Sequence, residues 1–277
     1  MGKQIPNVVL CMAEKIIQET FPRTSSRGRK PSYTIKTILQ EIFHLLRTGS
    51  QWRETSAVPY ATVFRYFKRW SGANIFRATY DRVYQQTAHY TQHSKSLRRF
   101  LSLDGSLVKS VFGRDVVGAN PTDRGRNGSK VSALVDETGL PISICFDKAN
   151  TADITLAMPT LSELAHVPLP KEKSRKRAIY ILADRGYDSR VFRLQCRKRG
   201  CIPVIPYRKR VGNQPQPKLT AREKRIIQGR NVVERFFAWL DQYRRVLVRY
   251  EKTLAHYESF IWLASSCIAS NRVESEL

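Results

Sequence analysis

The stretches Phe100–Asp104, FLSLD, and Ala178–Asp184, AIYILAD, decide the fold of this chain. The second is an unbroken apolar run before its aspartate, which is typical of a β-strand buried on both faces. The first predicts another short strand that also ends in an aspartate. If the two strands are neighbours in an open α/β sheet, their carboxylates meet at one edge of the sheet.

The segments around these strands predict a mixed sheet with helices on its faces. Alternating apolar and polar residues at 130–135 and 140–146 flank the turn Asp136–Gly139 and predict a hairpin. Strands and helices follow in the order of a ribonuclease-H-like α/β fold. The later predictions are helices at 151–165 and about 188–199, a strand at 201–205, and helices at about 221–245 and 253–271.

The first 95 residues or so predict helices alone, and one of these helices has a strongly basic side. Ser32 or Thr34 is the expected N-cap of a helix that stops at Gly49. A later helix carries an apolar face (Val63, Phe64, Phe67 and Trp70), with Arg65, Lys68 and Arg69 opposite. That arrangement suits a recognition helix in a DNA major groove, and a solvated face on a small helical bundle is the alternative. We therefore expect a helix-turn-helix-like DNA-binding domain at 1–95 and a catalytic domain with C-terminal helices at 96–277.

The charge of the chain indicates a polyanionic partner. Its 48 Lys and Arg against 23 Asp and Glu give a net charge of +25, and neutralising phosphates releases counterions. Nucleic acid is therefore the first candidate partner, with double-stranded DNA favoured by the basic helix, and a membrane surface is the second. No apolar segment is long enough to predict a membrane span. The 5 cysteines lack zinc-site spacing and indicate a reducing compartment. We expect the cytoplasm and nucleoid in a prokaryote, or the nucleus for a eukaryotic or viral host.

Three carboxylates are the candidate metal ligands: Asp104 and Asp184 after the two strands, and Glu234 in a late helix. Carboxylate oxygens suit Mg²⁺, for which Mn²⁺ can substitute, and phosphodiester chemistry commonly uses two such ions. Arg230 lies one helical turn before Glu234 and can hold a phosphate bidentately. From the residues alone, an Asp after a strand is more often a turn or cap residue, and a Glu in an amphipathic helix is more often solvated.

Six segments, in order, resemble one protein family over roughly residues 27–252. They are GRKPSYTIKTILQEIFHLLRTGSQWRE (28–54), ATVFRYFKRW (61–70), LSLDGSLVKS (101–110), GSKVSALVDETGLPISICFDKANTAD (128–153), ILADRGYDS (181–189) and RNVVERFFAWLDQYRRVLVRYEK (230–252). The chain resembles the short DDE transposases of bacterial insertion sequences, in the insertion-sequence-five-like and insertion-sequence-four-like group, which is related to the harbinger transposases. The resemblance implies that Asp104, Asp184 and Glu234 bind catalytic metal and that Arg230 is the signature arginine.

The resemblance also implies the reaction. A metal-dependent cut at the terminal inverted repeats of a transposon releases a 3′-hydroxyl, which then attacks target DNA. Pairing two ends implies a homodimer or a larger assembly. Related insertion sequences have a signature tyrosine and lysine where this chain has Ile227 and Asp241. Arg244 or Arg245, one turn further on, is the candidate for the missing positive charge.

Two other functions fit the residues less well. A regulator derived from a transposase would use the N-terminal domain without catalysis, but all three carboxylates are present. A ribonuclease-H-like nuclease would not need a helical domain that reads sequence. Further DNA-backbone contacts are expected at three basic stretches, 23–30, 171–177 and 208–225, and in the loop 113–130.

Overall fold

The computed structural model describes residues 4–22, 31–92, 100–162, 179–208 and 218–276 of the 277-residue chain. The chain forms two compact units. The helical unit comprises Met1–Ser94, Val111–Asp115 and Trp239–Leu277, and the sheet unit comprises Lys95–Ser110 and Val116–Ala238. The C-terminal residues thus group with the N-terminal helices, whereas the sequence placed them with the catalytic domain. The functional division at residue 95 stays a prediction.

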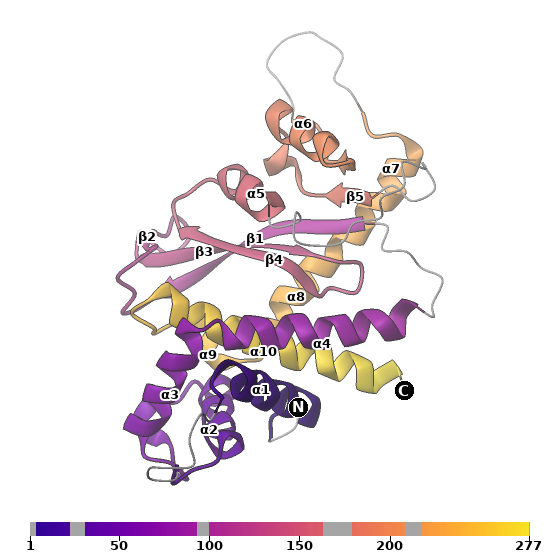
Figure 1. Cartoon of the computed structure of the whole chain (residues 1–277). Coiled ribbons are helices and arrows are strands. Elements are labelled where there is room, and N and C mark those ends of the chain that lie inside the picture. The colour runs from indigo at the N-terminus through magenta and orange to yellow at the C-terminus, as the bar shows by residue number, and fades with distance from the viewer. Residues whose placement is uncertain (1–3, 23–30, 93–99, 163–178, 209–217, 277) are drawn as a thin grey trace. The chain divides into compact units, whose positions relative to one another are not determined.

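The helical unit is built mainly from α-helices (Figure 1). Thr34 is the N-cap of one helix, because its side chain accepts a hydrogen bond from the Thr37 N–H, and Gly49 ends that helix with a positive φ of 71°. Within this unit lie α1 (Asn7–Thr20), α2 (Ile35–Thr48), a 3₁₀ helix (Trp52–Glu54), α3 (Tyr60–Gly72), α4 (Ile75–Gln92), α9 (Arg244–Leu247), β7 (Val248–Arg249) and α10 (Leu254–Glu276).

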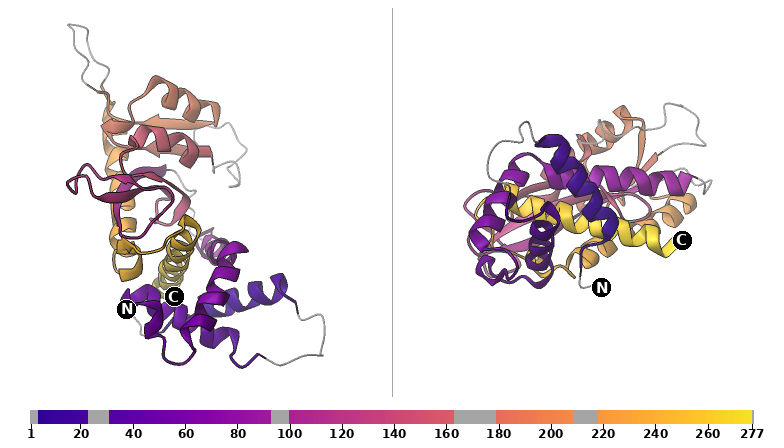
Figure 2. Two further views of the ribbon diagram at one scale, coloured as in Figure 1. Left: turned by 90° about the vertical axis from the view of Figure 1, so that its left-hand side faces the viewer. Right: turned by 60° about the horizontal axis from the view of Figure 1, so that its bottom comes forward.

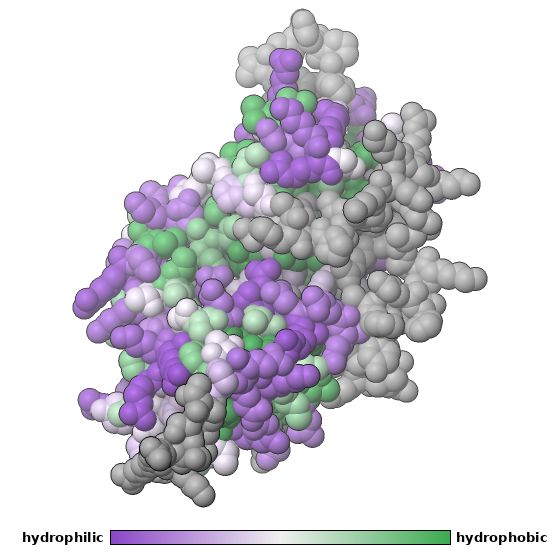
Figure 3. All heavy atoms as spheres, viewed as in Figure 1, coloured by the Kyte–Doolittle hydropathy of each residue, from purple (hydrophilic) through white to green (hydrophobic). Residues whose placement is uncertain are grey.

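The core of the helical unit is aromatic. Val63, Phe67 and Trp70 of α3 are buried, and the Phe67 ring stacks on Phe260 of α10 at 4.6 Å. The predicted apolar face of this helix is confirmed except at Phe64, which stays 38% exposed while its ring contacts Trp52. Hydrophilic residues cover much of the unit on the face drawn in Figure 3.

The sheet unit contains the predicted mixed sheet, with strand order β2-β3-β1-β5-β6 and β4 paired with β3. The strands β1 and β3 are antiparallel. Strand β5 lies between β1 and β6 and is parallel to both. The predicted hairpin is confirmed as β3 and β4. The bounds are β1 (Phe100–Ser110), β2 (Gly118–Ala119), β3 (Asn127–Val135), β4 (Pro141–Lys148), α5 (Asp153–Ser162), β5 (Ile179–Leu182), α6 (Arg190–Lys198), β6 (Cys201–Val204) and α7 (Ala221–Ile226).

Two predicted elements differ from the structure. The first strand does not stop at Asp104 but runs on to Ser110, because β3 continues to pair with it. The expected helix at about 221–245 is interrupted by the 3₁₀ helix Ile227–Arg230 before α8 (Asn231–Leu240). Gly229 lies in this interruption and passes close to the Phe100 ring, where a Cβ would come within 2.8 Å of a ring carbon.

Alternation along β1 sends neighbouring side chains to opposite faces of the sheet. The Ser102 hydroxyl lies 3.4 Å from the Gly229 carbonyl, so Ser102 and Asp104 face the segment that leads into α8. On the other face, the Thr160 hydroxyl of α5 lies 2.9 Å from that of Ser132 in β3. Two views show α7 and α8 running along one face of the sheet, with α5 and α6 on the other (Figures 1 and 2).

Candidate active site

Asp104 and Asp184 extend from neighbouring parallel strands at the same level. Ser102 of β1 pairs with Leu182 of β5, and each aspartate follows its paired residue by two positions. The sheet geometry expected from sequence is therefore present. Asp184 caps the 3₁₀ helix Arg185–Tyr187, because its Oδ1 accepts the Gly186 N–H at 2.7 Å.

Arg230 joins the first carboxylate to the third. Its Nη1 donates to Asp104 Oδ2 at 2.7 Å, and its Nη2 donates to Glu234 Oε1 at 2.8 Å. Arg230 and Glu234 lie four residues apart, at the spacing that places helical side chains on one face. The break before α8 therefore leaves the arginine aligned with the glutamate.

The three carboxylates share one electrostatic environment. Burial raises the pKa of Asp104, and the negative charges of Asp184 and Glu234 raise it further, while the Gly105 N–H and Arg230 oppose the rise. The Asp104 side chain is 25% exposed and that of Glu234 is 55% exposed, so solvent reaches the cluster. Like charges gathered at an accessible edge favour a bound cation.

The oxygen atoms of the three carboxylates suit a hard divalent cation. In this structure the positive charge beside Asp104 and Glu234 is that of the Arg230 guanidinium. Within the described residues, no three His, Cys, Asp or Glu side chains converge closely enough to hold a metal ion as they stand. The guanidinium lies between Asp104 and Glu234 and bonds to both. Carboxylate oxygens are the ligands that Mg²⁺ and Mn²⁺ prefer, so the residues suit such an ion in chemistry.

The face of the sheet opposite Asp104 carries an ion pair, between Lys130 and Asp153, that was not predicted from the sequence. Lys130 Nζ contacts Asp153 Oδ1 at 2.8 Å and donates to the Thr151 carbonyl at 2.6 Å. A Cβ on Gly105 would come within 3.0 Å of Asp153 Oδ1 and 3.7 Å of the Tyr187 hydroxyl, which is buried. Asp153 can lie this close to β1 because residue 105 is a glycine, and Gly105 is the feature of the sequence that could have indicated the contact.

The predicted DNA-contact residues divide by exposure. Arg65, Lys68 and Arg69 are exposed on α3, as expected, and Arg244 is exposed as well. Arg245 is instead 5% exposed and paired with Glu251 at 2.7 Å, which removes it from the candidates for phosphate contact. The stretches 23–30 and 171–177 and part of 208–225 lie outside the described residues.

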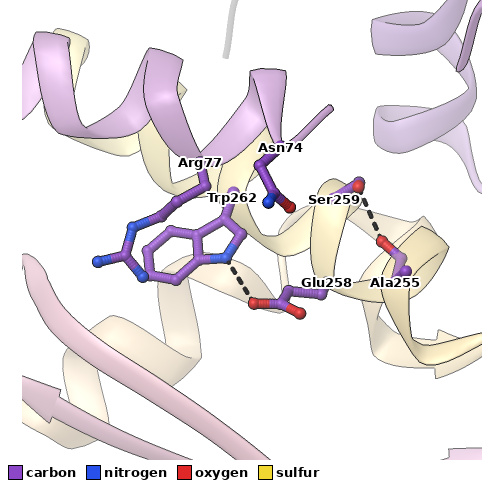
Figure 4. Close-up of a pocket in the computed structure, with 6 residues that line it drawn as sticks. All are labelled: Asn74, Arg77, Ala255, Glu258, Ser259 and Trp262. Atoms are coloured by element: carbon purple, nitrogen blue, oxygen red, sulfur yellow. Dashed lines mark hydrogen bonds between the residues drawn. The ribbon is translucent and has the colours of Figure 1, made fainter. Parts of the chain in front are cut away.

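A small hollow of about 200 Å³ lies in the helical unit between α4 and α10 (Figure 4). The Trp262 Nε1 donates to Glu258 Oε1 at 3.0 Å, and the Arg77 guanidinium lies 4.1 Å from the centroid of the Trp262 ring system. These groups contact one another, so the hollow is a packing feature. The described helices include none that is long and apolar enough to cross a membrane.

Comparison with known proteins supplies the family. The family described as "Transposase DDE domain" matches residues 95–271, and the family "Putative transposase of IS4/5 family" matches residues 13–79. The chain is 33% identical over 176 residues to the "Putative transposase for insertion sequence element IS402" of Burkholderia cepacia, covering 64% of this chain and 76% of the relative. It is 30% identical over 144 residues to the corresponding protein of element IS6501 of Brucella ovis, covering 50% and 96%.

A solved structure supports the same fold. The piggyBac transposase, in its synaptic complex with hairpin DNA, matches 99% of this chain and 73% of its own length with a TM-score of 0.55 at 12% identity. At that identity the likeness concerns the fold alone. Because the DDE family matches residues 95–271, which is more than half of the chain, the chain belongs to the DDE transposases, in the IS4/5 group of insertion-sequence enzymes.

Proposed function

We propose that this transposase cuts DNA at the inverted repeats of its own element and joins the released 3′ end to target DNA, with Asp104, Asp184 and Glu234 as the catalytic residues. The register between β1 and β5 carries the proposal, because two aspartates of distant sequence follow the paired residues Ser102 and Leu182 at the same level of the two strands. Arg230 contacts Asp104 and Glu234, which supports the glutamate as the third member.

The three carboxylates are proposed to hold Mg²⁺, with Mn²⁺ as a substitute and two ions as the expected number. When bound, such ions activate an attacking oxygen and stabilise the leaving one. Asp104 and Asp184 are fixed by backbone N–H groups, since Gly105 donates to Asp104 at 2.8 Å and Gly186 donates to Asp184 at 2.7 Å. These contacts keep the carboxylate orientations set before DNA arrives, which is the preorganisation that catalysis requires.

Arg230 is proposed to exchange partners during the reaction. In the free protein it contacts Asp104 and Glu234, and its side chain is 24% exposed. With its carboxylate partners engaged by a cation, the Arg230 guanidinium would be available to a phosphate oxygen of the scissile DNA. A planar guanidinium can contact two phosphate oxygens at once, which aligns the phosphodiester as well as neutralising it.

DNA recognition is proposed to reside on α3. Arg65, Lys68 and Arg69 are exposed there, while Val63, Phe67 and Trp70 anchor the helix from behind. A helix so anchored can enter a major groove without disturbing its own packing. Two transposon ends must be paired, so we propose that a homodimer or larger assembly forms on DNA. We propose the nucleoid as the site of action, since the DNA of a bacterium lies there and both relatives are bacterial.

The test is an end-labelled nicking assay on a duplex that carries the element ends, with Mg²⁺ or with EDTA. Cleavage at the element end that needs the cation and is lost in Asp184→Ala would support the proposal and lead to a strand-transfer assay. Specific DNA binding without cleavage under Mg²⁺ or Mn²⁺ would instead favour a DNA-binding regulator.

A further inference from the structure

A short strap, Val111–Asp115, connects two segments of the sheet unit but belongs to the helical unit. Its backbone is held to the residues that precede α10. The Val111 N–H donates to the Arg249 carbonyl at 2.9 Å, and the Arg114 N–H donates to the Lys252 carbonyl at 2.9 Å. These two bonds run in the same direction along both segments, so the strap lies in parallel register with residues 249–252.

A buried charge fastens the end of the strap. The Asp115 carboxylate pairs with Arg249, whose side chain is 0% exposed, and also accepts the Leu254 N–H at 2.8 Å. A buried guanidinium needs such a partner, because an uncompensated charge in the core is strongly unfavourable. The strap is therefore fixed on the helical unit, and so are the side chains that it carries.

The register places two exposed aromatic rings side by side. Phe112 of the strap is 58% exposed and Tyr250 is 40% exposed. Their ring centroids lie 6.2 Å apart at an interplanar angle of 51°. The Arg245 guanidinium lies 5.9 Å from the Tyr250 ring centroid and is itself held by Glu251. Single exposed apolar side chains are common, but two adjacent rings on a fixed backbone form a surface suited to a flat apolar ligand.

The charge around the rings selects the ligand. Arg114 and Lys252 are exposed beside Phe112 and Tyr250, and the nearby Asp115 is already paired with Arg249. The chain as a whole carries +25. Aromatic faces combined with cations suit nucleic acid whose bases are out of the helix, because a paired duplex hides its base faces within the stack.

We propose that Phe112 and Tyr250 form a stacking platform for unpaired bases of DNA, with Arg114 and Lys252 contacting the adjacent phosphates. The proposal rests on the proposed function, since it requires that the chain act on DNA at the ends of its element. It assigns to the strap a role in holding a separated strand, distinct from the duplex recognition proposed for α3.

The experiment measures binding of the full-length chain in EDTA, where cleavage does not interfere. The probes are a forked DNA with 2-aminopurine in its unpaired tail and a fully paired duplex of the same sequence. Phe112→Ala removes the ring and Phe112→Trp keeps an aromatic surface. Val191→Ala is the matched control, because Val191 is 63% exposed on α6 in the sheet unit. Thermal unfolding verifies that each variant is folded.

We expect Phe112→Ala to weaken binding of the fork about tenfold and to abolish the 2-aminopurine fluorescence change, with duplex binding unchanged. Phe112→Trp and Val191→Ala should behave like the wild type. Equal losses on fork and duplex, or full fork affinity in Phe112→Ala, would overturn the platform. Loss of self-association by sedimentation with unchanged fork binding would also overturn it and assign the rings to a second copy of the chain. Cleavage of paired ends in Mg²⁺ tests the proposed function separately.

Discussion

Two arginine–carboxylate clusters in this chain share their chemistry and differ in burial. Arg245 and Glu251 lie in the helical unit with side chains 6% and 2% exposed, and Arg245 also donates to the Ser50 carbonyl at 2.7 Å. Arg230 and Glu234 lie in the sheet unit with side chains 24% and 55% exposed. Separating a buried ion pair leaves a charge in the core without a partner, which is strongly unfavourable, so the pair stays together. An accessible pair can exchange partners, because water and other ions can replace either member. Burial, and not residue type, therefore separates the structural pair from the candidate functional one.

The largest expected effect is the loss of cleavage in Asp184→Asn. The amide retains an oxygen that can accept the Gly186 N–H but loses the charge needed for cation binding. We expect the rate of end cleavage to fall by about 10³-fold or more. The melting temperature should stay close to that of the wild type. Wild-type cleavage by this variant would remove Asp184 from the active site.

The buried cluster should show a large effect on stability. Glu251→Ala leaves the Arg245 guanidinium in the core without its carboxylate partner. We expect the free energy of unfolding to drop by about 3–5 kcal/mol. The matched variant Glu234→Ala, at the accessible cluster, should change it by about 0.5 kcal/mol or less. Urea unfolding of both variants makes the measurement, and similar losses would erase the proposed distinction between the clusters.

Arg230→Gln tests whether the accessible arginine contributes to cleavage. The change removes the cation between Asp104 and Glu234, so the metal-free protein should lose some stability that added Mg²⁺ restores. We expect the cleavage rate to fall about 10²-fold, because one donor to the phosphate is lost. Arg235→Gln, at an exposed arginine of α8, is the control. A variant that cleaves normally and gains nothing from Mg²⁺ would assign Arg230 to surface pairing.

The smallest expected effect concerns α3. Lys68→Ala removes one exposed charge from the proposed recognition helix. We expect the slope of log affinity against log salt to fall by about 1, with a modest loss of DNA affinity. Lys36→Ala, whose lysine lies 3.5 Å from Glu14 on the same unit, is the control. If the slope of log affinity against log salt falls equally in the two variants, Lys68 contributes to DNA binding only as one positive charge among many, and α3 is not the recognition helix.

Local patterns predicted much of this fold. The apolar run ending at Asp184 became β5, Thr34 became an N-cap, and the basic side of α3 is exposed opposite its buried residues. Such features depend on residue spacing along a few turns or strands, which the sequence displays directly. The break at Ile227–Arg230 was not predicted in this way; Gly229 within it lies against the ring of Phe100, which is distant in sequence.

Residue identity and spacing specify three acids in the order of the DDE family, a strongly basic chain, and the strands that carry the aspartates. The partners of these groups follow from the packing of the whole fold. Arg244 and Arg245 are neighbours of the same chemistry, yet the fold leaves Arg244 exposed and places Arg245 against Ser50, 195 residues away. In the same way it brings Phe112 beside Tyr250 and Lys130 to Asp153. Local preferences are set by near neighbours, whereas burial and long-range pairing are fixed only when the whole core packs.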